Sequence, residues 1–172
     1  YFISRCIEIA KYGSGFVSPN PLVGCVIIKD GEFLSEGYHK VFGGPHAEVN
    51  AINNSPKSVE GATLFVNLEP CSHTGKTPPC TNLIIEKKIK RVVIGAKDPN
   101  PLVSGKGIAI LKEKGIDVKV GILETECIEL NRFFYKYHNS GMPYISIKVA
   151  QTLDGKIADS YGDSKWITGE AS

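Results

Sequence analysis

The hydrophobic positions of this chain recur with two different periods. Short apolar runs rich in Val and Ile are typical of strands buried in a sheet, and they alternate with longer stretches whose apolar residues recur at helical spacing. We therefore predict strands over residues 22–29, 32–39, 63–68, 91–95 and 116–120, and helices over residues 1–12, 46–54, 80–88 and 123–137. A further helix is predicted between Ser104, which could cap it, and Gly115, which ends it.

The order of these elements indicates an α/β fold. Asp30-Gly31 is a strong signal for a tight hairpin turn between the first two strands. The later strands alternate with helices, which is typical of a mostly parallel sheet covered on both faces. In such sheets ligands bind beyond the carboxyl ends of the strands. We therefore expect the loops that follow residues 68 and 95 to share one crevice with the start of the helix at His46.

This crevice would hold a candidate metal site. His46, Cys71 and Cys80 are ligand types that zinc prefers, and three protein ligands leave a fourth position for water. Glu48 follows His46 by two residues, where a carboxylate could move the protons of that water. A His-x-Glu followed by Pro-Cys and a second Cys is the signature of zinc deaminases acting on nucleobases, in which the Glu is not a ligand. The sequence therefore predicts Zn²⁺ at the His and the two Cys, with Glu48 as the catalytic residue.

A structural zinc site is an alternative interpretation of the same residues. His73 could supply a fourth ligand and close the site, which would leave a non-catalytic module stabilised by zinc. This interpretation leaves Glu48 and the proline-rich loop without a purpose. It predicts that Glu48→Gln changes no property, whereas the catalytic interpretation predicts lost turnover with zinc retained.

The loop between the two motif cysteines holds eight residues where the usual signature has two, and we expect it to bear on substrate choice. Lys76 lies there in a Gly-Lys-Thr turn and can offer a cation to an anion such as a phosphate. Asp98 and Asn100 share a loop with two prolines, and Asn20 lies between two more. All three can bind ring or sugar groups, and all three are also common turn formers. His39, at the end of a predicted strand, has the pattern of an exposed residue.

Composition narrows the choice of partners. The 172 residues carry a formal net charge of +2, far from the basicity of a dedicated nucleic-acid-binding domain. The same zinc motif also allows a second hypothesis, a deaminase acting on a base of a nucleic acid or of a nucleoside. The low net charge argues against a nucleic-acid substrate. No apolar run reaches the length of a membrane span. Cys6, Cys25 and Cys127 lie outside the motif in apolar surroundings, and the odd total of five cysteines suits a reducing cytoplasm.

Four segments together resemble the bifunctional riboflavin-biosynthesis deaminase–reductase family. They are HAE at 46–48, EPCSHTGKTPPC at 69–80, KDPNP at 97–101 and PNPLVG at 19–24. The resemblance implies a cytidine-deaminase-like three-layer α/β/α sandwich with a mixed, mostly parallel sheet, and a homo-oligomer, either a dimer or a tetramer. The implied substrate is a phosphorylated pyrimidine, 2,5-diamino-6-(5-phosphoribosylamino)pyrimidin-4(3H)-one, which would lose its ring 2-amino group as ammonia. The implied substrate contacts are Asn20, His39, Lys76, Asp98 and Asn100.

The end of the chain departs from the preceding pattern. Gly141-Met142-Pro143 interrupts it, and a further strand is predicted over residues 144–150. A segment of this length cannot bury a core of its own. We therefore predict a zinc-dependent pyrimidine deaminase domain over residues 1–140, and a linker with the beginning of a second domain over residues 141–172.

Residues 141–172 resemble the opening of the family's NADPH-dependent reductase domain. Carried over by position, Ser164 would contact substrate there, and Ala150 and Trp166 would contact the cofactor. Because most of that domain lies beyond Ser172 in the family, we expect no reductase activity from this chain.

Overall fold

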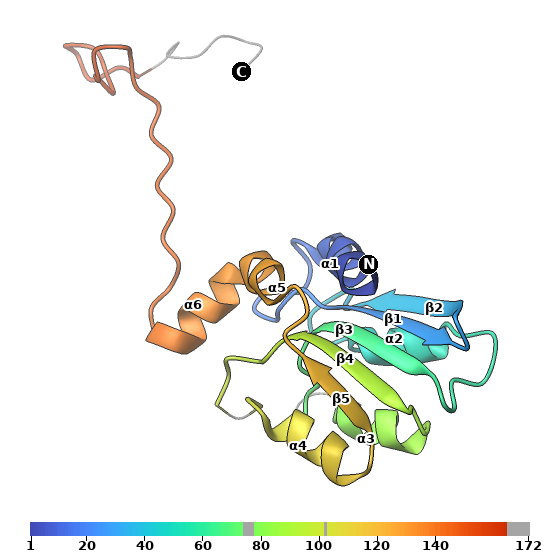
Figure 1. Cartoon of the computed structure of the whole chain (residues 1–172). Coiled ribbons are helices and arrows are strands. Elements are labelled where there is room, and N and C mark those ends of the chain that lie inside the picture. Colours follow the sequence, from blue (N-terminus) through green and yellow to red (C-terminus); the bar gives the residue numbers. More distant parts are fainter. Residues whose placement is uncertain (74–77, 102, 165–172) are drawn as a thin grey trace.

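The structure, a computed structural model, describes residues 1–73, 78–101 and 103–164. A five-stranded sheet in the order β2-β1-β3-β4-β5 lies between two layers of helices (Figure 1). The strands are β1 (Gly24–Lys29), β2 (Glu32–Tyr38), β3 (Thr63–Leu68), β4 (Arg91–Ala96) and β5 (Asp117–Val120). The helices are α1 (Phe2–Ala10), the 3₁₀ turn η1 (Lys11–Gly13), α2 (Ala47–Asn53), α3 (Cys80–Glu86), α4 (Lys106–Glu113), α5 (Glu124–Leu130) and α6 (Arg132–Ser140).

The sheet is mixed, and only β1 runs against the other strands. It is antiparallel to both β2 and β3, whereas β3 is parallel to β4, and β4 to β5. The predicted hairpin between β1 and β2 is confirmed. Its turn residues Asp30 and Gly31 have φ values of 51° and 82°, the left-handed conformation that tight hairpins require. The carboxyl ends of β2, β3, β4 and β5 therefore meet at one edge of the sheet, as expected.

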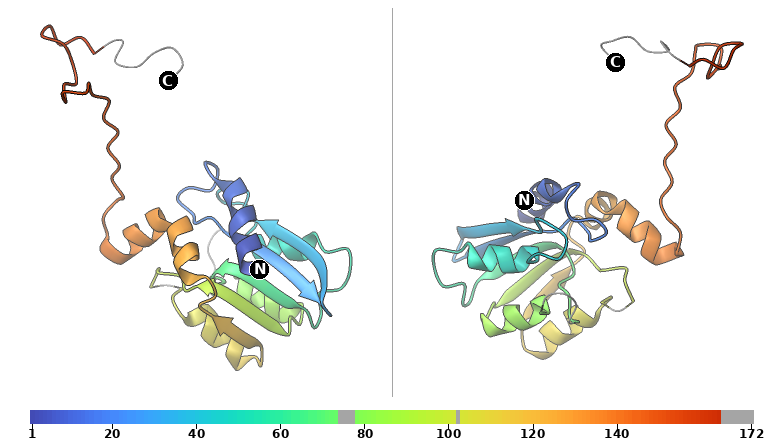
Figure 2. Two further views of the ribbon diagram at one scale, coloured as in Figure 1. Left: turned by 45° about the horizontal axis from the view of Figure 1, so that its top comes forward. Right: turned by 180° about the vertical axis from the view of Figure 1, so that it is seen from behind.

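Each face of the sheet has its own core, which confirms the three-layer α/β/α sandwich. Helices α2, α3 and α4 pack on one face, around Ala51, Ile84 and Leu111. Helices α1 and α5 pack on the other, around Ile3 and Cys127. Figure 2 shows the two layers from two further sides. Among the described residues, no helix combines the length and apolar character needed to cross a membrane.

The long helix predicted over residues 123–137 is wrong in one respect, because the structure divides it into α5 and α6. Asn131 lies between them with φ −111° and ψ 26°, outside the helical region. Its side chain accepts a hydrogen bond from the Leu22 N–H at 2.7 Å and donates one to the Leu22 carbonyl at 2.9 Å. These bonds to a distant segment turn the chain, so that α6 leaves the axis of α5.

Two further local predictions are corrected. Ser104 does not cap α4; the capping position is Gly105, with φ 75° and no side-chain bond to the helix. The strand predicted over residues 144–150 does not form, because a strand needs a partner and no described strand pairs with it. Instead the described part of the tail, residues 141–164, has neither helix nor strand and extends away from the α/β body (Figures 1 and 2).

We predict that Gly37→Ala destabilises the protein by about 2–3 kcal/mol, because α2 packs directly on β2 at this glycine. A Cβ at Gly37 would lie 2.3 Å from the backbone nitrogen of Ala51, so the helix would have to move. Gly44→Ala is the matched control, because its Cβ would first meet the side chain of Val41 at 3.0 Å. Urea denaturation of both variants measures the difference; equal midpoints would contradict the prediction.

Candidate active site

The three predicted metal ligands converge at the carboxyl edge of the sheet. Cys71 follows β3 in a loop, Cys80 is the first residue of α3, and His46 immediately precedes α2 in an extended conformation. The Nδ1 atom of His46 lies 3.2 Å from the Sγ atom of Cys80 and 3.5 Å from that of Cys71. All three donor atoms lie within 4.8 Å of one another.

This geometry fits a zinc ion. Zinc bonds to nitrogen and sulfur of about 2.0–2.3 Å, at tetrahedral angles, place neighbouring donor atoms about 3.5–3.8 Å apart. The two separations from His46 are close to this range. One nitrogen and two sulfurs are also a donor set that zinc prefers. His73 is not part of the cluster, so the described residues provide three ligands and do not form the closed site of the structural alternative.

The two thiols differ in acidity before any metal binds. The pKa of Cys71 is lowered, chiefly by a hydrogen bond from the Cys80 thiol and further by His46 and by the backbone N–H of Cys80, which lies 3.3 Å from Cys71 Sγ. The pKa of Cys80 is raised by the same interaction with Cys71 and by its burial. Because metal ligation requires thiolates, zinc binding here would release the proton that the pair shares.

Glu48 lies beside this cluster in the first turn of α2, and only 3% of its surface is exposed. Burial raises the pKa of its carboxyl, and the negative charge of Cys71 raises it further, while His46 acts in the opposite direction. A raised carboxyl pKa is what a group needs if it is to both accept and donate protons near neutral pH. The three donor atoms and Glu48 thus meet at the N-terminal end of α2, in the crevice expected from the sequence.

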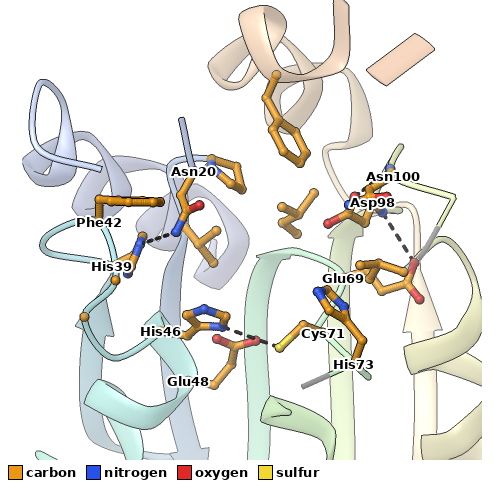
Figure 3. A pocket seen from close by; sticks show the side chains of 17 residues that line it. Asn20, His39, Phe42, His46, Glu48, Glu69, Cys71, His73, Asp98 and Asn100 are labelled. Atoms are coloured by element: carbon orange, nitrogen blue, oxygen red, sulfur yellow. Dashed lines mark hydrogen bonds between the residues drawn. The ribbon is translucent and has the colours of Figure 1, made fainter. Parts of the chain in front are cut away.

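A cavity of about 280 Å³ opens over the cluster, and His46, Glu48 and Cys71 line it. Polar side chains predicted to contact substrate line the same cavity (Figure 3). They are Asn20, His39, Asp98 and Asn100. The topology therefore brings residues that are far apart in the sequence to one cavity. Lys76 lies outside the described residues, as does Trp166, whereas Ala150 and Ser164 are exposed on the extended tail.

His39 is buried, not exposed as its pattern suggested, and its hydrogen bonds define its tautomer. Its Nδ1 atom lies 3.0 Å from the carbonyl oxygen of Pro45, which can only accept, so Nδ1 carries the proton. Its Nε2 atom then accepts from the Asn20 amide at 3.0 Å. Burial lowers the pKa of His39, which favours the same neutral form. The pair fixes the orientation of the Asn20 amide at the cavity wall.

Glu69 was not predicted as a site residue, yet it organises the Asp98 loop. Its buried carboxylate accepts hydrogen bonds from the backbone N–H groups of Gly105 at 2.9 Å, and of Asp98 and Ile108 at 3.3 Å each. It thereby joins the end of β3 to the loop after β4 and to the start of α4. The signal available in the sequence was a Glu immediately before the Pro-Cys of the metal motif.

Asp98 is also buried, and its environment changes its acidity. Burial raises the pKa of its carboxyl to about 6, and the neighbouring Glu69 contributes in the same direction. The backbone N–H of Asn100, which donates to Asp98 Oδ1 at 2.7 Å, opposes this effect. At neutral pH Asp98 is therefore an ionised acceptor at the cavity wall.

Two aromatic residues also line the cavity and were missed by the sequence analysis. Phe42 lies close to His39 and Asn20 in Figure 3, and Phe134 comes from α6. Phe42 follows a strand, where no periodic pattern marks it, and Phe134 stands between two other aromatic residues. Only the tertiary arrangement shows that these rings face the cavity.

Residues 1–96 match the model of the cytidine and deoxycytidylate deaminase zinc-binding region. The match covers more than half of the chain and includes His46, Glu48, Cys71 and Cys80. The chain therefore belongs to the family of cytidine- and deoxycytidylate-deaminase-like zinc-binding proteins.

Within this family, the chain is similar to several riboflavin-biosynthesis proteins. The chain is 52% identical over 171 residues to the riboflavin biosynthesis protein RibD of Actinobacillus pleuropneumoniae, covering 99% of this chain and 46% of the relative. A solved diaminohydroxyphosphoribosylaminopyrimidine deaminase/5-amino-6-(5-phosphoribosylamino)uracil reductase from Thermotoga maritima is 54% identical with a TM-score of 0.89, over 98% of this chain and 49% of that one. Form 1 of Acinetobacter baumannii RibD is 49% identical with a TM-score of 0.94, over 99% and 48%. The chain thus spans about half the length of the curated relatives it matches.

We predict that Asp98→Asn stabilises the folded protein at pH 7.5 by about 1 kcal/mol, after allowing for partial solvation. Because the folded pKa of Asp98 is about 6, above its ordinary value of 3.8, the ionised carboxylate destabilises the fold above pH 6. This penalty disappears as the pH falls toward 4, so the two proteins should converge there.

Denaturation of both proteins at pH 7.5 and pH 4.5, in the presence of a chelator, compares the same metal-free state throughout. A difference in stability that is the same at both values would contradict the assigned acidity of Asp98.

Proposed function

We propose that this chain is a zinc-dependent hydrolytic deaminase acting on 2,5-diamino-6-(5-phosphoribosylamino)pyrimidin-4(3H)-one. The products would be 5-amino-6-(5-phosphoribosylamino)uracil and ammonia. The observation that carries the proposal is the buried carboxylate of Glu48 beside a cluster of three zinc-type donors, in a cavity whose wall includes several polar side chains. A purely structural metal site would need neither the carboxylate nor the cavity.

His46, Cys71 and Cys80 would hold the metal. A zinc ion bound by three protein ligands supplies a Lewis acid that lowers the pKa of water to about 7. Glu48 would accept a proton from the attacking water, transfer it to the adjacent ring nitrogen, and deliver the second proton to the departing amino group. One carbon–oxygen bond forms and one carbon–nitrogen bond breaks, so water and substrate give the uracil and ammonia. The raised pKa of Glu48 suits this exchange.

The substrate proposal rests on the relatives and on the cavity walls. The solved structure from Thermotoga maritima carries the name of a deaminase acting on a phosphoribosylaminopyrimidine. In this chain Asn20, Asp98 and Asn100 place amide and carboxylate groups around the cavity, where they can bind ring and ribose groups. We propose these three residues, His39 and Lys76 as the substrate contacts.

The remaining parts of the proposal concern the longer protein. We propose that residues 1–140 form the deaminase domain and that residues 141–172 begin an NADPH-dependent reductase domain. Ala150, Ser164 and Trp166 would act in that second domain, and not at the zinc site. A cytoplasmic dimer or tetramer is the assembly that the resemblance implies.

We predict that the zinc-loaded chain releases ammonia from the diaminopyrimidine ribotide and that Glu48→Gln lowers this turnover by a factor of at least about 10³. The amide cannot accept the proton of water, whereas it leaves the three metal ligands in place. Ammonia release and the zinc content of each protein are the two measurements. Cys80→Ser is the comparison, because it should lose bound zinc as well as turnover.

Equal turnover by the wild type and Glu48→Gln would contradict the catalytic role of this residue. If the wild type binds one equivalent of zinc but releases no ammonia from the ribotide, the proposed substrate is wrong. The same assay with cytidine, deoxycytidylate and single-stranded DNA would then test the second hypothesis, a deaminase of nucleosides or nucleic acids.

A further inference from the structure

Three residues at the start of α6, one of them the capping residue that precedes the helix, lie near the cavity, and neither the zinc chemistry nor the substrate contacts proposed above include them. They are Asn131, Phe134 and Tyr135, and we call them the α6 inner face. The backbone N–H of Tyr135 donates to the Asn131 carbonyl at 3.0 Å, so Asn131 caps the helix and the other two residues lie in its first turn. Residues three and four positions apart share one side of a helix. All three side chains therefore lie on one side of α6.

Asn131 fixes the loop that carries Asn20. Its amide bonds both the N–H and the carbonyl of Leu22, at 2.7 and 2.9 Å, and its side chain is buried. Only Pro21 separates Leu22 from Asn20. The Leu22 carbonyl also accepts from Asn67 on β3 at 3.0 Å, whereas the bond to the Leu22 N–H comes from Asn131, so Asn131 contributes to the direction in which the loop leaves Leu22.

Tyr135 fixes the loop that carries Asp98 and Asn100. Its hydroxyl donates to the carbonyl of Lys97 at 2.5 Å, and only 8% of the residue is exposed. Lys97 immediately precedes Asp98. The first turn of α6 therefore bonds to one loop through Asn131 and to the other loop through Tyr135.

Phe134 lies between these two anchors and lines the cavity itself. Its ring packs against His138, with 4.4 Å between the ring centroids, so it is supported from within the helix. A supported aromatic ring in the wall of a cavity gives a flat apolar surface to a planar heterocycle or to the carbon atoms of a ribose. The two loops add the polar side chains of Asn20, Asp98 and Asn100 to the same cavity wall.

We propose that the α6 inner face adapts this deaminase to its substrate, with Phe134 contacting the substrate and with Asn131 and Tyr135 as positioning residues. The anchors hold the Asn20 loop and the Asp98 loop at the separation that the substrate requires. This inference rests on the proposed function. It assigns to α6 an effect on substrate affinity and none on the proton transfers, because the side chains of Asn131 and Tyr135 bond to Leu22 and to Lys97.

Helix α6 offers a matched control for each residue. Tyr135→Phe removes the anchoring hydroxyl, and Tyr137→Phe removes an exposed one from the same helix. Phe134→Leu removes the ring in the cavity, and Phe133→Leu removes an exposed ring. Asn131→Ser retains a side chain that can cap the helix but is too short to bond both groups of Leu22, and Asn139→Ser is its exposed counterpart.

The experiment measures kcat, KM and zinc content for all six variants with the diaminopyrimidine ribotide. We expect each inner-face variant to raise KM by about tenfold, the loss expected from one net hydrogen bond or one ring contact, with kcat within about threefold and zinc unchanged. The three controls should match the wild type. A second measurement, the Kd of the ribotide for the same variants combined with Glu48→Gln, should show the same tenfold loss without turnover.

Three results would overturn the inference. The first is equal KM for inner-face and control variants, while the wild type remains active. The second is a joint loss of kcat and zinc in the inner-face variants, which would mean that α6 merely supports the metal site. The third is a wild type that neither turns over nor binds the ribotide; in that case the proposed function fails first, and the inference falls with it.

Discussion

The site depends on placing two thiols, an imidazole and a carboxylate together in a buried position. Cys80 and Glu48 are almost completely buried; the hydrogen bond with Cys71 and burial raise the pKa of Cys80, and burial raises the pKa of Glu48. Several anionic groups brought together without a cation repel one another and lose solvation, so the arrangement is unfavourable in itself. A divalent cation removes most of this penalty, because it pairs with the thiolates where they lie. The fold supplies the rigid elements that keep the four groups in place until the metal binds.

Buried side chains, more than sheet hydrogen bonds, hold the segments around this cluster. Asn67 on β3 is fully buried, accepts from the Gly24 N–H at 2.7 Å and donates to the Leu22 carbonyl at 3.0 Å. Asn131, which precedes α6, forms hydrogen bonds with Leu22, and Glu69 accepts hydrogen bonds from the loop after β4. Loops cannot satisfy their backbone groups through a ladder, and each unsatisfied buried group costs about 1–3 kcal/mol. Side chains that provide these bonds therefore determine where the substrate loops lie.

The sequence predicted the parts of the site whose chemistry and order are local. His46, Glu48, Cys71 and Cys80 were found because their types and spacing are restrictive, and the sheet topology correctly placed the Asp98 loop beside them. The bend at Asn131 was missed because helical periodicity continues through it, and its bonds reach a residue 109 positions away. Asn is a poor residue for a helix interior, since its side chain competes for backbone groups. That signal was present, but its partner could be known only from the tertiary structure.

The metal-ligand cluster and Glu48 precede residue 96, whereas part of the cavity wall follows it in the chain. The matched zinc-binding region ends at residue 96 and contains the whole cluster with Glu48. Asp98, Asn100 and Phe134 follow it in the chain and line the same cavity. A catalytic centre that is complete by residue 96 can keep its geometry while the residues after it change. The cavity wall can thus change after residue 96 while the four residues of the cluster stay the same.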